Sequence, residues 1–303
     1  MGIDSVKCND IFGLNNLLGR YINPHFVINS PHGLTQLIGY LKYHRELNGP
    51  VFFRGQNKDF FSMKPSLSRE MVNFSTFKKA QEKLKSFVNN SSSKRYFIRG
   101  TNRIAYEPIL QHYGISTEWL DVVDNLWTAL WFASHTAYSS GKNNRYVFYE
   151  KSKFEYSYIF VMYFGEKNYP ITKNQIKRMK QYGIIEEYTP EENIKEVYGL
   201  LETEKYQIID LRYMAPSLYR RPHAQHAILV KKIAFTSYED LDYKDSIIAS
   251  IKIKTSLIHE WLGAGSLMDT SFVFPPPVID DGYRILLEQF PQDPQGVGCI
   301  NIY

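Results

Sequence analysis

Cysteine is the rarest residue in this chain of 303 residues, with only Cys8 and Cys299 present. Two cysteines so far apart form no Cys-x-x-Cys pair, no zinc knuckle and no disulfide framework, and such sparse usage is typical of a reducing compartment. The signatures His-x-x-x-His, Gly-x-Ser-x-Gly and Gly-x-x-x-x-Gly-Lys are also absent. Zinc proteases, serine hydrolases and P-loop enzymes are therefore disfavoured, and we predict no metal site and no firmly required cofactor.

Long apolar runs are missing as well. No stretch approaches the roughly 20 apolar residues that a membrane-spanning helix needs. Asp4 and Lys7 stand where a signal peptide needs an apolar run, and Val6 stands where a myristoylation motif needs Ser or Thr. We therefore expect a cytoplasmic protein with no membrane partner. The excess of positive charge is small, a formal +5 over the whole chain, so nucleic acid is permitted as a partner but not required.

Aromatic residues, in contrast, are abundant at 15%, with 23 Tyr and 19 Phe. Such rings serve as partly exposed core or as amphipathic binding surface. The 44% hydrophobic and 22% charged fractions are those of an ordinary globular chain, long enough to bury a substantial core. Composition alone does not decide between one large domain and two smaller ones.

The hydrophobic pattern predicts alternating helices and strands. Ser30 and Pro31 begin a helix over about 30–47, which the breakers at 48–50 end, and "VFFR" then forms a buried strand. Asp124 is expected to cap a buried helix in "NLWTALWFASHTAYSS", because this stretch has almost no polar face. Further helices are predicted at 75–88, 103–113 and 256–265, and further strands at 157–164, 206–213, 226–232 and 246–253.

Two segments are expected at the periphery. Residues 166–203 are charged and carry a capping box at Thr189, which predicts helices near 173–182 and from 190 to about 201. The basic stretch "GKNNRYVFYEKSK" at 141–153 is predicted to be a loop or an exposed hairpin with a solvated surface. A proline-stiffened loop, "FPPPVIDDG", follows the last predicted helix.

Polar side chains interrupt this apolar pattern in two places. Arg54 follows an apolar triplet, and Gly55 would let the backbone turn and a ligand approach closely. A guanidinium offers a planar fork of donors for phosphate or carboxylate, but it could equally pair with a buried carboxylate such as Asp121. Thr117 and Asp121 lie four residues apart, so they would share one face of a helix. Asp121 also precedes the buried helix, whose positive dipole end would stabilise its carboxylate either as a structural cap or as part of a binding site.

Histidine and arginine residues supply further candidates. His112 is expected in the last turn of a helix, where the dipole would raise its pKa and suit it to bind phosphate or act as an acid; capping of carbonyl groups is the structural alternative. Arg221 and Gln225 belong to a donor-rich turn that could close over an anion or be surface.

The polar blocks together make the chain similar to a known family. It resembles the FRG domain proteins, a bacterial family named for its Phe-Arg-Gly motif. The resemblance implies an α+β fold with a mixed, mostly antiparallel central sheet flanked by helices, in a single domain over 1–303. The matching blocks are "FFRGQ" at 52–56, "PSLSR" at 65–69, "QHYGISTEWLDVVDNLWTALWFA" at 111–133, "RRPHAQHAILV" at 220–230 and "SFVFPPPVIDDG" at 271–282.

Two functional hypotheses remain open. The layout is similar to that of ADP-ribosyltransferases, which implies an enzyme that transfers ADP-ribose or hydrolyses NAD as its substrate: Arg54 would hold pyrophosphate or ribose, and Tyr113 or Trp119 would stack on the base. The alternative is a non-catalytic module in bacterial defence or stress that binds a nucleotide or another phosphate-bearing ligand, a nucleic acid or a protein. The candidate catalytic residues are Asp121, His112 and Glu260, and the candidate ligand-binding residues are Arg54, Gln56, Arg69, Gln111, Tyr113, Thr117, Arg221 and Gln225.

Overall fold

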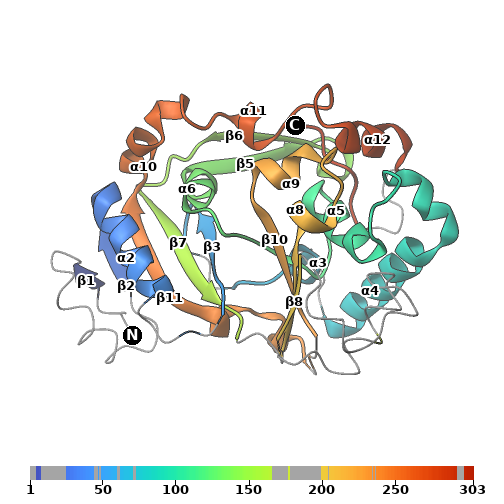
Figure 1. Ribbon diagram of the computed structural model, residues 1–303, viewed down its shortest axis with the longest axis horizontal. Coiled ribbons are helices and arrows are strands. Elements are labelled where there is room, and N and C mark those ends of the chain that lie inside the picture. The colour runs from blue at the N-terminus through green and yellow to red at the C-terminus, as the bar shows by residue number, and fades with distance from the viewer. Residues whose placement is uncertain are drawn as a thin grey trace.

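The computed structural model shows one mixed sheet with helices around it (Figure 1). It describes residues 5–7, 25–43, 47, 49–59, 62–70, 73–165, 177, 199–203, 205–233, 235, 237–291 and 297–303. Within these ranges, no helix is long and apolar enough to cross a lipid bilayer.

Nine strands of the described chain form the main sheet, in the order β1-β2-β11-β7-β3-β4-β10-β9-β8. The pairs β1–β2 and β2–β11 are parallel and the other pairs are antiparallel, which confirms the predicted mixed, mostly antiparallel α+β architecture. A separate hairpin pairs β5 with β6. The strand bounds are β1 Ser5–Lys7, β2 His25–Ile28, β3 Val51–Gln56, β4 Leu120–Val123, β5 His135–Ser140, β6 Tyr146–Lys151, β7 Tyr156–Tyr163, β8 Leu200–Glu202, β9 Tyr206–Asp210, β10 Ala227–Lys232 and β11 Ile247–Lys254.

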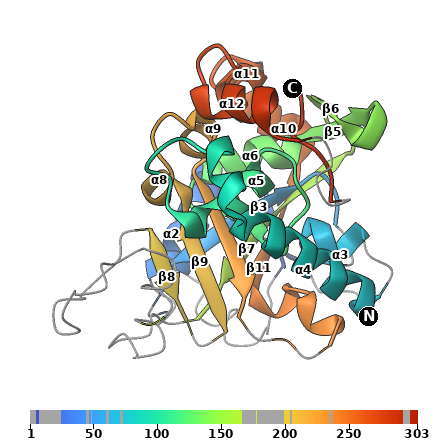
Figure 2. The ribbon, with the colours of Figure 1, turned by 90° about the vertical axis from the view of Figure 1, so that its right-hand side faces the viewer.

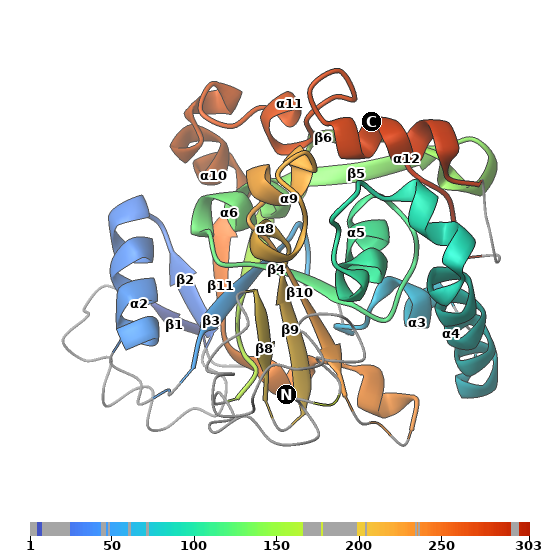
Figure 3. The ribbon, with the colours of Figure 1, turned by 45° about the vertical axis from the view of Figure 1, so that its right-hand side comes forward.

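The helices cover the sheet and one end of the molecule. In Figure 3, α5, α6, α8 and α9 lie over the sheet, and α10, α11 and α12 run along the end where the hairpin also lies. The core has two sides: Phe53 of the sheet packs with residues of α2 and α6, whereas Phe52 points to the opposite face, toward Tyr243. The helix bounds are α2 Pro31–Tyr43, α3 Ser66–Glu70, α4 Phe74–Asn89, α5 Tyr106–His112, α6 Leu126–Ser134, α8 Leu211–Met214, α9 Arg220–Ala224, α10 Thr255–Trp261, α11 Thr270–Val273 and α12 Asp281–Gln289.

Several predicted elements are confirmed. Helix α2 begins where expected, with the Ser30 hydroxyl accepting the Gly33 N–H at 3.0 Å. The predicted helix at 75–88 is α4, and the predicted strands at 157–164, 226–232 and 246–253 are β7, β10 and β11 within one or two residues. These segments have strong local signals, either a clear helical period or a continuous apolar run.

The buried helix after Asp124 is shorter than predicted. Helix α6 ends at Ser134, and residues 135–140 form β5, because they pair with β6. This pairing partner lies outside the local pattern that suggested a helix. The cap is also one residue later: Asn125 Oδ1 accepts the N–H groups of Trp127 and Thr128. Asp124 cannot serve there because Arg212 holds its carboxylate.

Three other boundaries were wrong. The strand predicted to reach 213 stops at Asp210, because that side chain accepts the Arg212 N–H at 3.0 Å and begins α8. The helix predicted to reach 201 cannot do so, since residues 200–202 form β8; the rest of the predicted insertion helices lies outside the described residues. The loop predicted at 274–282 is present but ends at Asp280, because that side chain accepts the Tyr283 N–H and begins α12.

Strands β3 and β4 meet at a seam in the middle of the sheet. Only Phe53 and Val123 are paired across it, whereas β3 pairs with β7 along its whole length. Helix α6 follows β4 and packs directly on Gly55 of β3, where an added Cβ atom would overlap the carbonyl oxygen of Ala129. Gly55 therefore allows a helix to approach the strand, and not a ligand as its sequence context suggested.

Candidate functional site

Arg54 closes the seam between β3 and β4. Its Nη1 donates a hydrogen bond to the main-chain carbonyl oxygen of Asp121, so the guanidinium replaces a strand-to-strand bond where the ladder has stopped. Burial lowers the pKa of Arg54 to about 10, which leaves the side chain charged at neutral pH. Its Nε is buried and has no hydrogen-bond partner among the described residues. The partner is thus the Asp121 backbone, not the carboxylate pair that the sequence suggested.

Gln111 links the remaining polar residues of this region. Its Nε2 donates to Asp121 Oδ2 at 2.9 Å, and its Oε1 accepts the hydroxyl groups of Thr117 at 2.8 Å and Ser66 at 3.1 Å. The Thr117 N–H also points to Gln111 Oε1, at 3.2 Å. The structure therefore brings together Arg54, Gln111, Thr117 and Asp121. We call these four residues and Ser66 the Gln111 network.

The Gln111 side chain is largely satisfied within its network, although the Nε atom of Arg54 is not. The Gln111 carbonyl oxygen receives three donors and its amide nitrogen is committed to a carboxylate, so the side chain has little capacity left for a guest. Thr117 is fully buried, and its hydroxyl oxygen also accepts the Trp119 N–H at 3.1 Å. This arrangement fixes the loop between α5 and β4 more clearly than it offers a binding surface.

Arg221 is fully buried in a box of four aromatic rings. Its guanidinium carbon lies 4.4 Å from the ring centres of Tyr113 and Tyr283, 4.2 Å from that of Tyr303 and 5.4 Å from that of Phe274. Such contacts stabilise a cation that water cannot reach. Its position rules out the solvated surface that was one alternative for this turn.

His112 lies next to this buried cation. Burial, and to a lesser degree the positive charge of Arg221, lower the pKa of His112 to about 3, and a main-chain hydrogen bond only partly opposes this shift. The expected rise from the helix dipole is therefore wrong, because desolvation and a like charge outweigh it. A histidine that stays neutral at physiological pH is poorly suited to act as a general acid there.

The other candidates with stacking or amide groups are held in the interior. Tyr113 and Trp119 are almost completely buried, so neither ring is free to stack on a base. The Tyr113 hydroxyl donates to Asp280 Oδ2 at 2.7 Å, and Gln225 donates to the Val273 carbonyl oxygen at 2.8 Å. These two bonds tie α5 and α9 to the segment after α10.

Three predicted residues are not members of the Gln111 network, although the charge of Arg69 acts on Arg54. Gln56 is on β3 and its Nε2 lies 3.6 Å from Met63 Sδ. Arg69 is exposed at the end of α3, and Glu260 is exposed on α10. The structure does not bring these three side chains together with Asp121 and His112 in one catalytic arrangement.

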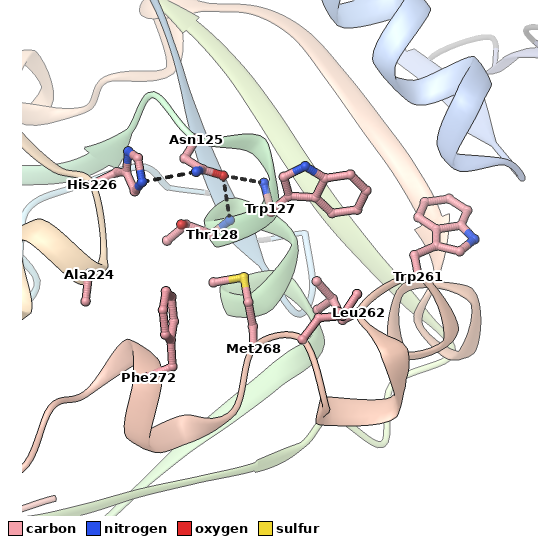
Figure 4. A pocket seen from close by; sticks show the side chains of 10 residues that line it. Asn125, Trp127, Thr128, Ala224, His226, Trp261, Leu262, Met268 and Phe272 are labelled. Carbon is pink, nitrogen blue, oxygen red and sulfur yellow. Dashed lines mark hydrogen bonds between the residues drawn. The ribbon is translucent and has the colours of Figure 1, made fainter.

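A cavity of about 340 Å³ lies beside the first residues of α6 (Figure 4). Its walls are mostly aromatic and aliphatic, and its polar groups come from the start of α6 and from the residue before β10. Figure 4 shows these side chains around a common space, with Phe272 and Met268 facing the α6 terminus. The lining residues are Asn125, Trp127, Thr128, Ala224, His226, Trp261, Leu262, Leu267, Met268 and Phe272.

His226 marks the polar edge of this cavity. Its backbone has φ of 51°, a left-handed conformation that is unusual for a residue with a side chain and that clusters at functional sites. Because Asn125 Oδ1 is committed to the helix N–H groups, Asn125 Nδ2 faces His226 Nε2 as a donor, at 3.2 Å. The other ring nitrogen, Nδ1, lies 3.2 Å from Asp124 Oδ1.

Arg212 holds this edge in place. Its Nη2 lies 2.6 Å from a carboxylate oxygen of Asp210 and 2.6 Å from one of Asp124. The hydrogen bond to Asp210, followed by that to Asp124, raises the pKa of Arg212 above its ordinary value. Sequence reasoning missed this group, because Asp124 was taken as a helix cap and Arg212 as part of a strand.

The FRG domain family model matches residues 49–142. Residues 49–142 therefore match the FRG domain, as the motif blocks within that stretch suggested. No curated protein and no solved structure matches it. The matched stretch holds the Gln111 network and the α6 side of the cavity, whereas His226 and the α10–α11 wall come from the later chain.

Among the described residues, no group of three or more His, Cys, Asp or Glu side chains is arranged to hold a metal ion.

Proposed function

We propose that this FRG domain protein binds a nucleotide whose base lies in the cavity beside Asn125 and Trp127. The observation that carries the proposal is the character of the cavity: about 340 Å³ of space with apolar and aromatic walls and three polar side chains, Asn125, Thr128 and His226. Small-molecule sites have this size and this mixture, with few polar groups that fix the orientation of the ligand.

The contacts at the rim favour a planar, uncharged part of the ligand inside. Trp127 is 40% exposed and lines the cavity, so one face of its indole is available for stacking on a heterocycle. The Asp124 carboxylate beside His226 repels phosphate at that edge. We therefore expect the base or a nicotinamide ring inside the cavity and the phosphates on its open side.

NAD consumption is a second candidate, and Glu260 favours it. Glu260 is exposed and directly precedes Trp261, which lines the cavity, so its carboxylate is the acidic group that this candidate function assigns to the ribose next to the bound ring. A carboxylate there would stabilise the positive charge that develops on a ribose as its glycosidic bond breaks. This role for Glu260 also rests on the similarity in layout to ADP-ribosyltransferases, which is an analogy at the level of the fold.

Calorimetry with NAD, ADP-ribose, AMP and adenosine tests the binding. Filling the cavity by Ala224→Trp should abolish it, whereas Ala137→Trp on the exposed hairpin is the matched control and should retain it. If none of the four compounds binds at about millimolar concentration, the proposal is wrong. Release of nicotinamide from NAD by the wild type, lost in Glu260→Gln, would show catalysis; NAD that binds and is recovered intact would show a binding module.

A further inference from the structure

The β5–β6 hairpin has two faces of opposite character. It stands apart from the nine-stranded sheet, near the C-terminal end of the chain (Figure 2). On its inner face, Tyr149 stacks on Phe274 with ring centres 4.6 Å apart and lies parallel to Tyr303 at 6.3 Å. This face therefore completes the core. The outer face has no such structural duty, because its rings point into solvent.

Three aromatic rings share that outer face. The strand register pairs Tyr138 with Phe148 and Ser140 with Tyr146, and side chains two residues apart on a strand lie on the same side. Tyr138 and Phe148 are 39% and 48% exposed and stack on each other at 5.4 Å with an interplanar angle of 18°. Tyr146 is 52% exposed. The hairpin thus holds a row of rings in water, where single exposed rings would be unremarkable but a preorganised row calls for a partner.

The chain around the row is basic. In the stretch 141–153, the basic residues Lys142, Arg145, Lys151 and Lys153 outnumber the single acidic residue, Glu150. Lys142 and Arg145 lie in the turn between the strands, next to the row. At the other end Glu150 pairs with Thr136 on the outer face, whereas Lys151 lies on the side of Tyr149 and donates to the Ala264 carbonyl oxygen at 3.3 Å. These positive charges explain why this stretch stood out in the sequence.

A second segment, in which Lys58 is followed by Asp59, reaches the base of the hairpin. Asn57 donates to the Thr136 hydroxyl at 2.8 Å, and Thr136 belongs to the same outer row as Tyr138. This bond places Lys58 close to the row, where its ammonium lies 5.7 Å from the ring of exposed Phe154. Aromatic rings with lysine and arginine at the turn end form a surface that is complementary to a negatively charged chain with planar groups.

We propose that the outer face of the β5–β6 hairpin binds single-stranded nucleic acid. Bases would stack on Tyr138, Phe148 and Tyr146, while Lys142 and Arg145 would contact the phosphates. A single strand is required because the faces of paired bases are covered in a duplex, and stacking without base-edge contacts makes the surface tolerant of sequence. The row spans about two residue pairs, roughly 7 Å at 3.3 Å per residue, which matches two or three stacked bases. This site is separate from the cavity and does not rest on nucleotide binding there.

Fluorescence anisotropy with labelled oligothymidine and oligouridine of about 20 nucleotides, and with a DNA duplex of equal length, tests the site. We expect the single strands to bind and the duplex to bind more weakly. Tyr138→Ala combined with Phe148→Ala should weaken binding by about fivefold or more for each ring that stacks. Tyr213→Ala, which removes an aromatic side chain that is 66% exposed on α8, is the matched control and should bind as the wild type.

Two further variants separate the contributions. Lys142→Ala should reduce the slope of log affinity against log salt by about 0.7, as expected for one phosphate contact on a single strand. The cavity-filling variant Ala224→Trp should bind the oligonucleotides as the wild type, which distinguishes this site from the proposed nucleotide site. The inference is overturned if the single strands do not bind, if duplex binds equally well, or if the double aromatic variant, shown to be folded by circular dichroism, binds without loss. Loss of binding in Ala224→Trp alone would also overturn it.

Discussion

The Gln111 network and the cavity differ in polarity and in openness. The network is rich in hydrogen bonds: Gln111 alone connects Asp121, Thr117 and Ser66. The cavity is poor in polar groups and open. The difference teaches that polar motif residues in an apolar context can serve to hold strands and loops in place, while the space for a guest is bounded by side chains that look like ordinary core.

The largest expected effect is on the frame. In Gly55→Ala the new methyl group would overlap the Ala129 carbonyl oxygen, so α6 must move away from β3, and we expect a loss of about 3 kcal/mol or more in the free energy of unfolding. Gly39→Ala is the control: it lies inside α2 with no atom near the added methyl group, and should stabilise by about 0.5–1 kcal/mol. Urea unfolding measures both. A Gly55→Ala protein as stable as the wild type would refute the close packing.

The network itself should come next. Gln111→Leu removes the partner of the Thr117 hydroxyl and of the Asp121 carboxylate, and we expect a loss of about 1–3 kcal/mol in unfolding free energy. Gln36→Leu on exposed α2 should change stability by less than about 0.5 kcal/mol. If Gln111→Leu instead leaves stability intact and abolishes nucleotide binding, the network is a ligand site and the comparison fails.

Low pH should reduce the stability of the folded protein through His112. Its folded pKa is about 3 and its ordinary value is 6.5, so below about pH 6.5 the unfolded chain takes up a proton that the folded protein refuses. The stability contributed by the neutral side chain is present above pH 6.5 and is lost as pH falls from there toward 3, by about 1 kcal/mol per pH unit. Urea midpoints of the wild type and His112→Gln at several pH values measure this. His32→Gln, at an exposed position, is the control: its stability difference from the wild type should change little or not at all with pH.

The smallest stability effect belongs to the cavity. Trp127→Ala removes a half-exposed ring, so the unfolding free energy should change by less than about 0.5 kcal/mol. Nucleotide affinity, measured by calorimetry, should nevertheless fall by about tenfold or more. Tyr138→Ala, equally exposed but remote from the cavity lining, should leave that affinity unchanged. Equal affinities for wild type and Trp127→Ala would remove the stacking role.

Much of the fold could be predicted from the sequence because the relevant signals are local. The buried strand before Arg54 and the cap at Ser30 each occupy a few neighbouring residues, and the motif blocks drew attention to Arg54, Gln111, Thr117 and Asp121. Their mutual contacts could be suspected but not their closed arrangement, since the partner of Arg54 is a main-chain carbonyl group that no residue type announces.

The rest depends on contacts between distant segments. Arg221 is buried because Tyr113, Tyr283 and Tyr303 surround it, and nothing in its own neighbourhood predicts that. The same burial reverses the expected pKa shift of His112. The cavity was invisible because Trp127 and Thr128 read as one more turn of a buried helix, and its opposite wall follows more than 130 residues later at Trp261.

The single residue pair between β3 and β4, called a rung here, suggests how a ligand in the cavity would affect the sheet. His226 leads into β10, on the β4 side of that rung, whereas Trp261 and Met268 follow β11, on the β3 side. A molecule seated between these walls would act as a cross-brace over the weakest join in the sheet. Occupancy of the cavity would then be reported by slower amide hydrogen exchange in β3 and β4.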